Sequence, residues 1–90
     1  GIYPVGTLVR LESGRLGGVT EQNEQSLLLP KVKVFMSART RRSIEPVVIN
    51  LASQQAHDTI LKVESPEDWD LEDIDELWLG AQVAGDFDPL

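Results

Sequence analysis

Short stretches of alternating hydrophobic and polar residues, separated by turn-forming residues, run through the first two thirds of the chain. Residues 7–11 alternate so that Val9 and Leu11 face one side of a strand. A Ser-Gly pair at residues 13–14 supplies a turn, and residues 16–20 return as a second strand. This pattern predicts a β-hairpin.

Two adjacent glycines, Gly17 and Gly18, interrupt the returning strand of this hairpin. Glycine inside a strand typically marks a bulge, a sharp bend or the close approach of another backbone. We therefore expect the ladder to be irregular here, as it often is where a small barrel closes.

The next strands are predicted from the same period of two. In residues 31–36, Val32 and Val34 share one face, and Lys31 and Lys33 are expected to point to solvent. Residues 44–49 predict a fourth strand, whose early proline suits a strand start. Residues 60–63 predict a fifth.

The acidic end of the chain changes from strand to helix periodicity. Ser65 and Pro66 suit the N-cap and first position of a helix or of a single turn. Beyond them, apolar residues recur at intervals of three or four and predict one buried stripe, made of Leu71, Ile74, Leu77 and Trp78. Gly80 is expected to end this helix.

These elements predict a mainly β fold. We expect a small five-stranded twisted sheet or partly open barrel over residues 1–64, a short acidic helical appendage packing on it at 65–80, and a tail at 81–90. Ninety residues suffice for one domain with one modest core.

Charge is distributed unevenly along the chain, whose net charge is -7. Residues 1–50 carry seven Arg and Lys against four Asp and Glu, whereas residues 51–90 carry one Lys against eleven acids. An acidic total argues against general binding to a phosphate backbone, which requires clustered cations. The acidic half is expected to be solvated or to pair with the basic half, although a cationic partner is an alternative.

Residues able to carry out catalysis are scarce. The chain has no cysteine, which excludes disulfides, thiolate catalysis and cysteine-ligated metals. Its one histidine, His57, precedes Asp58, but adjacency in sequence does not supply the geometry of a catalytic triad. The glycines of residues 14–18 match no phosphate-binding motif. We therefore expect no catalytic residue, no metal ligand and no cofactor in this chain.

The one cationic cluster consists of Arg39, Arg41 and Arg42. Guanidinium groups bind phosphates and carboxylates, so an anion contact is one interpretation of this cluster. A polar turn that pairs with the acidic end is the other. Trp69 and Trp78 are expected to be buried or to anchor a domain contact, rather than to stack on bases.

The strand pattern also resembles a known family. Residues 1–23 (GIYPVGTLVRLESGRLGGVTEQN), together with residues 30–34 and 44–51, resemble the segment that follows the catalytic helices in bacterial HD-GYP proteins, which degrade cyclic di-GMP. The resemblance extends to about residue 78 and is most specific over residues 3–11. It implies that the chain begins where a helical catalytic domain ends.

The resemblance assigns no catalytic or metal-binding residue to this chain. Ile2 interrupts the Gly-Tyr-Pro signature, and His57 with Asp58 is not the family's metal-binding pair, because that centre needs several histidines. The two- or three-metal centre of iron or manganese that the family implies would belong to the parent protein. The resemblance thus implies a cytoplasmic, noncatalytic C-terminal accessory domain in signalling.

In that role the chain is expected to pack on its own upstream catalytic domain or to mediate other protein contacts, with no membrane association. Its expected contact surface consists of Tyr3, Trp69, Leu71, Ile74, Leu77 and Trp78. A homodimer that swaps the last helix is a further expectation. The alternative function is a small-barrel nucleic-acid or nucleotide-binding module, of the Src-homology type, working through Lys31, Lys33 and the three arginines. The net charge makes nucleic acid an unlikely partner.

Overall fold

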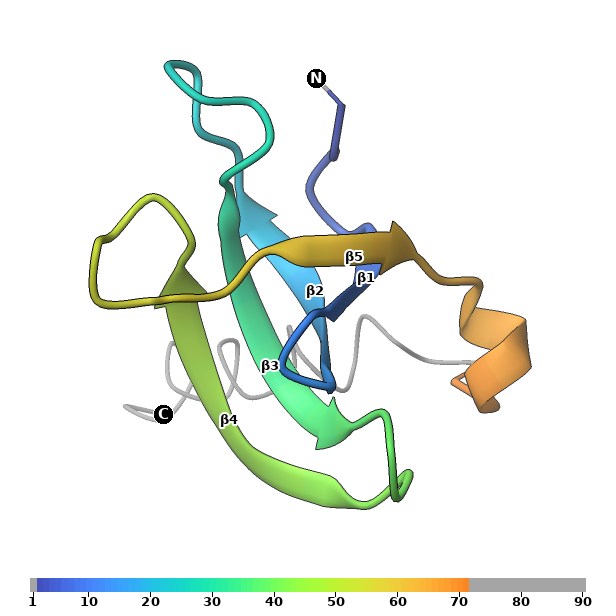
Figure 1. Cartoon of the computed structure of the whole chain (residues 1–90). Coiled ribbons are helices and arrows are strands. Elements are labelled where there is room, and N and C mark those ends of the chain that lie inside the picture. The colour runs from blue at the N-terminus through green and yellow to red at the C-terminus, as the bar shows by residue number, and fades with distance from the viewer. Residues whose placement is uncertain (1, 72–90) are drawn as a thin grey trace, which may run out of the picture.

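The computed structural model describes residues 2–71 and shows a single five-stranded sheet in which every pairing is antiparallel (Figure 1). The strands are β1 (Leu8–Leu11), β2 (Arg15–Glu21), β3 (Lys31–Ser37), β4 (Ser43–Asn50) and β5 (Ile60–Val63). Their order across the sheet is β4-β3-β2-β1-β5, so the last strand returns to pair with the first.

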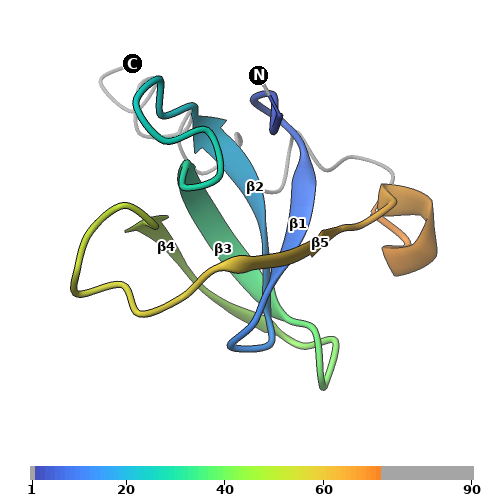
Figure 2. The same ribbon diagram turned by 45° about the horizontal axis from the view of Figure 1, so that its top comes forward.

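The sheet is strongly bent but not closed. β5 runs across the direction of β3 and β4, and the two outermost strands, β4 and β5, are not paired with each other (Figure 1, Figure 2). The mainly β prediction is confirmed, and the five predicted strands agree with the observed ones to within a residue or so at each end. The start predicted at Ser65 and Pro66 forms a single 3₁₀ turn, which ends at Trp69. The second helix, expected to open at Asp70 and to end at Gly80, lies outside the described residues from residue 72 onward.

The inner face of the sheet carries the larger core cluster. Its buried members are Val9, Leu11, Val19, Val32, Val34 and Leu51. Partly buried residues of β4 and β5, among them Ile44, Ile49 and Ile60, pack against it. All five strands contribute side chains to this cluster, and the sheet curls around it. Each strand therefore places an apolar side chain at every second position, where it points inward.

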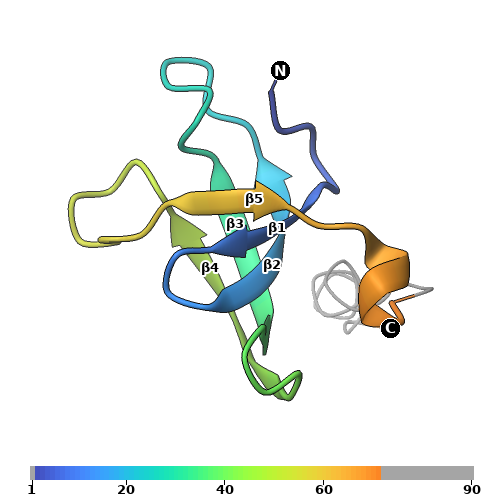
Figure 3. The same ribbon diagram turned by 45° about the vertical axis from the view of Figure 1, so that its right-hand side comes forward.

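The outer face carries a second cluster, made of Leu8, Leu16, Phe35, Trp69 and Leu71. The last two come from a single 3₁₀ turn, η1 (Pro66–Trp69), and the residues after it. Figure 3 shows this turn beside the end of β5. The described part of the predicted appendage therefore packs on the sheet. Ser65 precedes the turn, but its side chain does not cap it, because it donates to Glu67 Oε1 instead.

The β2–β3 ladder is irregular at the glycine pair, as expected. The register shifts between Leu16 and Gly17. A Cβ at Gly17 would collide with the backbone oxygen of Lys33 and would lie only 2.7 Å from the Cα of Val34. Glycine is required at this position because the backbone of β3 occupies the space that a side chain would take.

The expectation that Lys33 points to solvent is wrong. Lys31 is partly exposed, whereas Lys33 is only 9% exposed on the outer face of β3. Alternation correctly assigns Lys33 to the face opposite Val32 and Val34. It does not reveal that this second face is covered as well.

In the described part of the chain, no helix is long and apolar enough to cross a membrane.

Candidate functional site

The most elaborate group of side chains on the outer face surrounds Trp69. The fold of η1 turns this indole onto the sheet, where it is 6% exposed. Its Nε1 donates a hydrogen bond to Oε1 of Glu64 at 3.2 Å. Glu64 directly follows β5, so the hydrogen bond joins the end of that strand to the turn.

Two arginines from distant parts of the chain lie against the same indole. The guanidinium carbon of Arg41 is 4.3 Å from the ring centroid, and that of Arg10 is 5.5 Å away. Arg41 Nη2 also donates to the backbone oxygen of Asp68 at 3.2 Å. The negative face of an indole attracts such cations, so both contacts stabilise the packing of η1 against the sheet.

An ion pair whose two contacting atoms are buried lies next to the indole. Arg10 Nε lies 3.2 Å from Oε2 of Glu64, whose side chain is 7% exposed. The two atoms do not meet the angular requirement of a hydrogen bond, so the contact is electrostatic. Because Glu64 also accepts from Trp69, its charge is held by two neighbours, and the group functions as a clamp on the first residues after β5.

The predicted cationic cluster is divided among separate environments. Arg41 contacts Trp69, whereas the side chain of Arg39 lies against Gly14 of the β1–β2 turn. Arg42 is exposed. The two lysines predicted to belong to the same surface also lie in different environments. Lys31 Nζ is 3.5 Å from Glu21 Oε1, whereas Lys33 is buried.

His57 and Asp58 do not act as a pair. His57 is exposed in the loop between β4 and β5, whereas the Asp58 side chain is 2% exposed. Asp58 accepts hydrogen bonds from the backbone N–H of Ser13 at 3.1 Å and of Thr59 at 3.0 Å, and from Arg15 Nη2 at 3.0 Å. These bonds join the first hairpin to the loop that precedes β5, which is a structural role.

The hydrogen bonds also set the acidity of Asp58. Burial alone raises the pKa of this carboxyl, but the hydrogen bonds from Ser13, Arg15 and Thr59 together outweigh burial and hold the pKa below its ordinary value of 3.8.

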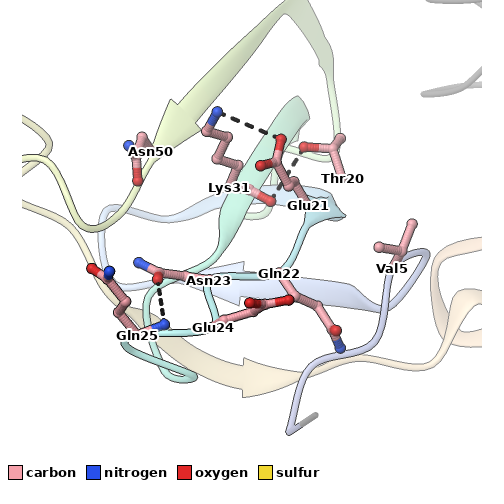
Figure 4. Close-up of a pocket in the computed structure, with 9 residues that line it drawn as sticks. All are labelled: Val5, Thr20, Glu21, Gln22, Asn23, Glu24, Gln25, Lys31 and Asn50. Atoms are coloured by element: carbon pink, nitrogen blue, oxygen red, sulfur yellow. Dashed lines mark hydrogen bonds and ion pairs between the residues drawn. The ribbon is translucent and has the colours of Figure 1, made fainter.

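A polar hollow of about 660 Å³ lies between the β2–β3 loop and the end of β4 (Figure 4). It is lined by Val5, Thr20, Glu21, Gln22, Asn23, Glu24, Gln25, Lys31 and Asn50. Some of its polar groups contact one another: Lys31 Nζ lies 3.5 Å from Glu21 Oε1, and Asn23 Oδ1 accepts from the backbone N–H of Gln25 at 2.9 Å. Among residues 2–71, no group of three or more potential metal ligands is found here or elsewhere.

The expected contact residues occupy different positions. Tyr3 is partly buried beside the inner cluster, and Trp69 and Leu71 are buried in the outer cluster rather than exposed. Ile74, Leu77 and Trp78 lie outside the described residues. A role of these six residues in binding a partner stays a prediction.

Large apolar residues are exposed on the two edge strands, a feature that the strand pattern in the sequence does not predict. On β4 these are Val47 and Val48, at 48% and 55% exposure, and on β5 they are Leu61 and Val63, at 57% and 52%. The proline within the fourth strand was the signal for an edge, since proline is found mainly on edge strands.

Comparison with known proteins finds a relative that aligns with nearly the whole chain. The chain is 52% identical over 88 residues to a region of the cyclic di-GMP phosphodiesterase PA4108 of Pseudomonas aeruginosa. The aligned region covers 97% of this chain but 21% of that protein, so the chain spans about a fifth of the length of its relative. No family model matches the chain, and no solved structure matches it.

Proposed function

We propose that this chain is the noncatalytic accessory region of a protein resembling an HD-GYP cyclic di-GMP phosphodiesterase, in which it packs on the catalytic domain or mediates protein contacts. The observation that carries the proposal is the similarity, along nearly the whole chain, to a limited part of a cyclic di-GMP phosphodiesterase. A region of this size, whose residues 2–71 bring together no catalytic constellation, is suited to support or regulation of a larger enzyme.

The chemistry of the described residues supports a noncatalytic role. Phosphodiester hydrolysis by a metal centre needs several histidines and carboxylates converging on one site. The one histidine, His57, is exposed, and Asp58 is engaged by Ser13 and Arg15. The iron or manganese centre implied by the family would therefore be held by other parts of the parent protein, in the cytoplasm.

The exposed edge strands support a role in protein contacts. Val47 and Val48 on β4, and Leu61 and Val63 on β5, present apolar side chains beside backbone edges that pair with no other strand within residues 2–71. Apolar residues beside an open edge favour association with another protein surface. We assign the exposed apolar side chains of these strands to contact with the upstream catalytic domain, and a homodimer formed through the same side chains, without strand pairing at β4, is the alternative.

No arrangement of cations favours the nucleic-acid alternative. Arg41 is engaged by Trp69 and Asp68, Lys31 by Glu21, and Lys33 is buried. A backbone-binding surface requires several cations free on one face.

A chimera tests the proposal. The matching region of the Pseudomonas aeruginosa relative is replaced by this chain, and hydrolysis of cyclic di-GMP is measured with Mn²⁺ or Fe²⁺. We expect the chimera to retain turnover, deletion of the region to reduce turnover or protein yield, and the isolated chain to show none.

The matched control is the same chimera carrying Leu16→Asp. Leu16 is fully buried in the outer cluster, so a carboxylate there should unfold the inserted region and mimic the deletion. Metal-dependent turnover by the isolated chain would overturn the noncatalytic assignment. A deletion with unchanged turnover and yield would overturn the accessory one.

A further inference from the structure

A second, smaller hollow of about 250 Å³ lies where the end of β1 and the β1–β2 turn meet β5 and the residues that follow β3. Two arginines, Arg10 and Arg39, line it together with apolar residues that include Leu61. Among the described residues, Glu12 is the one carboxylate in the lining, and its Oε2 accepts a hydrogen bond from Thr59 Oγ1 at 2.7 Å. The hollow therefore combines two cations with an apolar wall.

Contacts within the chain position both arginines. Arg10 Nε lies 3.2 Å from Glu64 Oε2, and its guanidinium carbon is 5.5 Å from the centroid of the Trp69 ring. Arg39 lies against Gly14, with its Nε only 2.7 Å from the position that a Cβ on that glycine would take. Side chains that are held in place before binding lose less conformational entropy when a partner arrives.

Both arginines keep hydrogen-bonding capacity. Within residues 2–71, the hydrogen bonds that arginine side chains donate come from Arg15 and Arg41, and Arg39 takes part in no ion pair. An arginine presents five N–H donors in a planar fork that matches the oxygens of a carboxylate or a phosphate. Two such forks beside one hollow favour an anionic occupant.

The size and the surroundings of the hollow indicate the kind of anion. Sites for small-molecule ligands usually enclose about 300–1,000 Å³, so a hollow of about 250 Å³ suits a single side chain better than a complete ligand. Its wall includes Leu61, which is 57% exposed and belongs to the apolar surface assigned above to contact with the catalytic domain. Charge, size and continuity with this surface point to a carboxylate side chain of that partner.

We propose that an aspartate or glutamate of the upstream catalytic domain inserts its carboxylate between Arg10 and Arg39 when the apolar surface of β5 docks on that domain. The inference rests on the proposed function and deepens it, because it names the chemistry that the catalytic domain contributes. Apolar contact has no preferred direction, whereas a carboxylate held by two guanidinium groups fixes one orientation of the two surfaces.

Zero-length cross-linking of the chimera described above tests the inference. Arg39→Lys introduces a primary amine at the hollow, and a carbodiimide joins this amine to a carboxylate in contact with it. We expect mass spectrometry to find the amine linked to an aspartate or glutamate of the catalytic domain. Arg42→Lys, at the exposed neighbouring arginine, is the matched control and should not give this product.

Two results of the cross-linking would overturn the proposal. Links only to carboxylates within the same 90 residues would show that the chain itself fills the hollow. Links only between copies, detected in a mixture of ¹⁴N and ¹⁵N protein, would show that a second copy fills it.

Reversal of the charge gives a second test. Arg39→Glu and Arg42→Glu should have the same Tm in the isolated chain, because both arginines are exposed. In the chimera, the amides of β5 should exchange with solvent faster in Arg39→Glu than in Arg42→Glu by about tenfold or more, since two carboxylates then face each other and weaken the docking. Equal exchange rates in the two chimeras would overturn the proposal.

Failure of this inference is distinguishable from failure of the proposed function. If deletion of the region leaves turnover and yield unchanged, the accessory role itself is wrong. If the deletion is harmful but each Arg39 variant behaves like its Arg42 control, only the carboxylate contact is wrong.

Discussion

Arg41 lies against Trp69: its guanidinium carbon is 4.3 Å from the indole centroid, and its Nη2 donates to the backbone oxygen of Asp68 at 3.2 Å. The turn between β3 and β4 is thereby joined to η1, 28 positions further along the chain. We predict that Arg41→Ala lowers the free energy of unfolding by about 1 kcal/mol, since it removes a cation–π contact and one hydrogen bond.

Urea unfolding followed by tryptophan fluorescence measures this effect, and the folded spectrum should shift to the red as Trp69 gains water. Arg42→Ala, at the exposed neighbouring arginine, is the matched control and should stay within about 0.5 kcal/mol of the natural chain. Equal losses of unfolding free energy in Arg41→Ala and Arg42→Ala would contradict a stabilising contact between Arg41 and Trp69.

Substitution of Asp58 is predicted to lower the free energy of unfolding more than substitution of most other polar residues. Asp58→Ala leaves the backbone N–H groups of Ser13 and Thr59 and the guanidinium of Arg15 without their acceptor. Loss of a partner from a buried charged network costs about 3 kcal/mol. Chemical denaturation at pH 7 measures this, with Glu24→Ala at an exposed loop carboxylate as the control. A loss at Asp58 no larger than at Glu24 would argue against the network.

The same carboxyl predicts a pH dependence. The hydrogen bonds hold the folded-state pKa of Asp58 below 3.8, so its contribution to stability is present above about pH 4 and is lost as the pH falls through the folded-state value. The stability difference between the natural chain and Asp58→Asn should therefore be constant from pH 5 to 7 and shrink on acidification below about pH 4. A difference that grew on acidification would contradict the sign of the shift.

Gly17 is predicted to tolerate no side chain. In Gly17→Ala the new Cβ meets backbone atoms of Lys33 and Val34, which cannot rotate away as a side chain could. Overpacking of this kind costs about 1–3 kcal/mol, and more where strands must separate. Thermal unfolding compared with Glu21→Ala, at the exposed end of the same strand, tests the prediction. A stable Gly17→Ala chain would show that β2 and β3 are further apart.

Pro46 is predicted to keep β4 from pairing with a second chain. β4 is an outermost strand, and proline offers no N–H to a new partner. Pro46→Val should raise the sedimentation coefficient as the protein concentration increases, with little loss of stability. Pro66→Ala, at a proline away from any strand edge, is the control. Unchanged sedimentation of Pro46→Val would indicate that the bend of β4 alone prevents pairing.

The alternation of apolar and polar residues was enough to predict the strands, because each strand buries the side chains at every second position. It could not predict which strands are outermost, since that depends on β5 returning to β1. The candidate site shows the same division. Arg41 and Trp69 each attract notice in the sequence, but their contact depends on where η1 packs. In the sequence Asp58 stands next to His57, whereas its hydrogen-bond partners Ser13 and Arg15 lie more than 40 positions earlier.

The pairing of β1 with β5 has a consequence for how the molecule forms. Val9 lies opposite Val63, so the sheet gains its final strand only after more than 50 intervening residues have been arranged. Loop closure over such a separation is entropically costly and slows folding. During synthesis, the edge of β1 that pairs with β5 stays without its partner until β5 has left the ribosome.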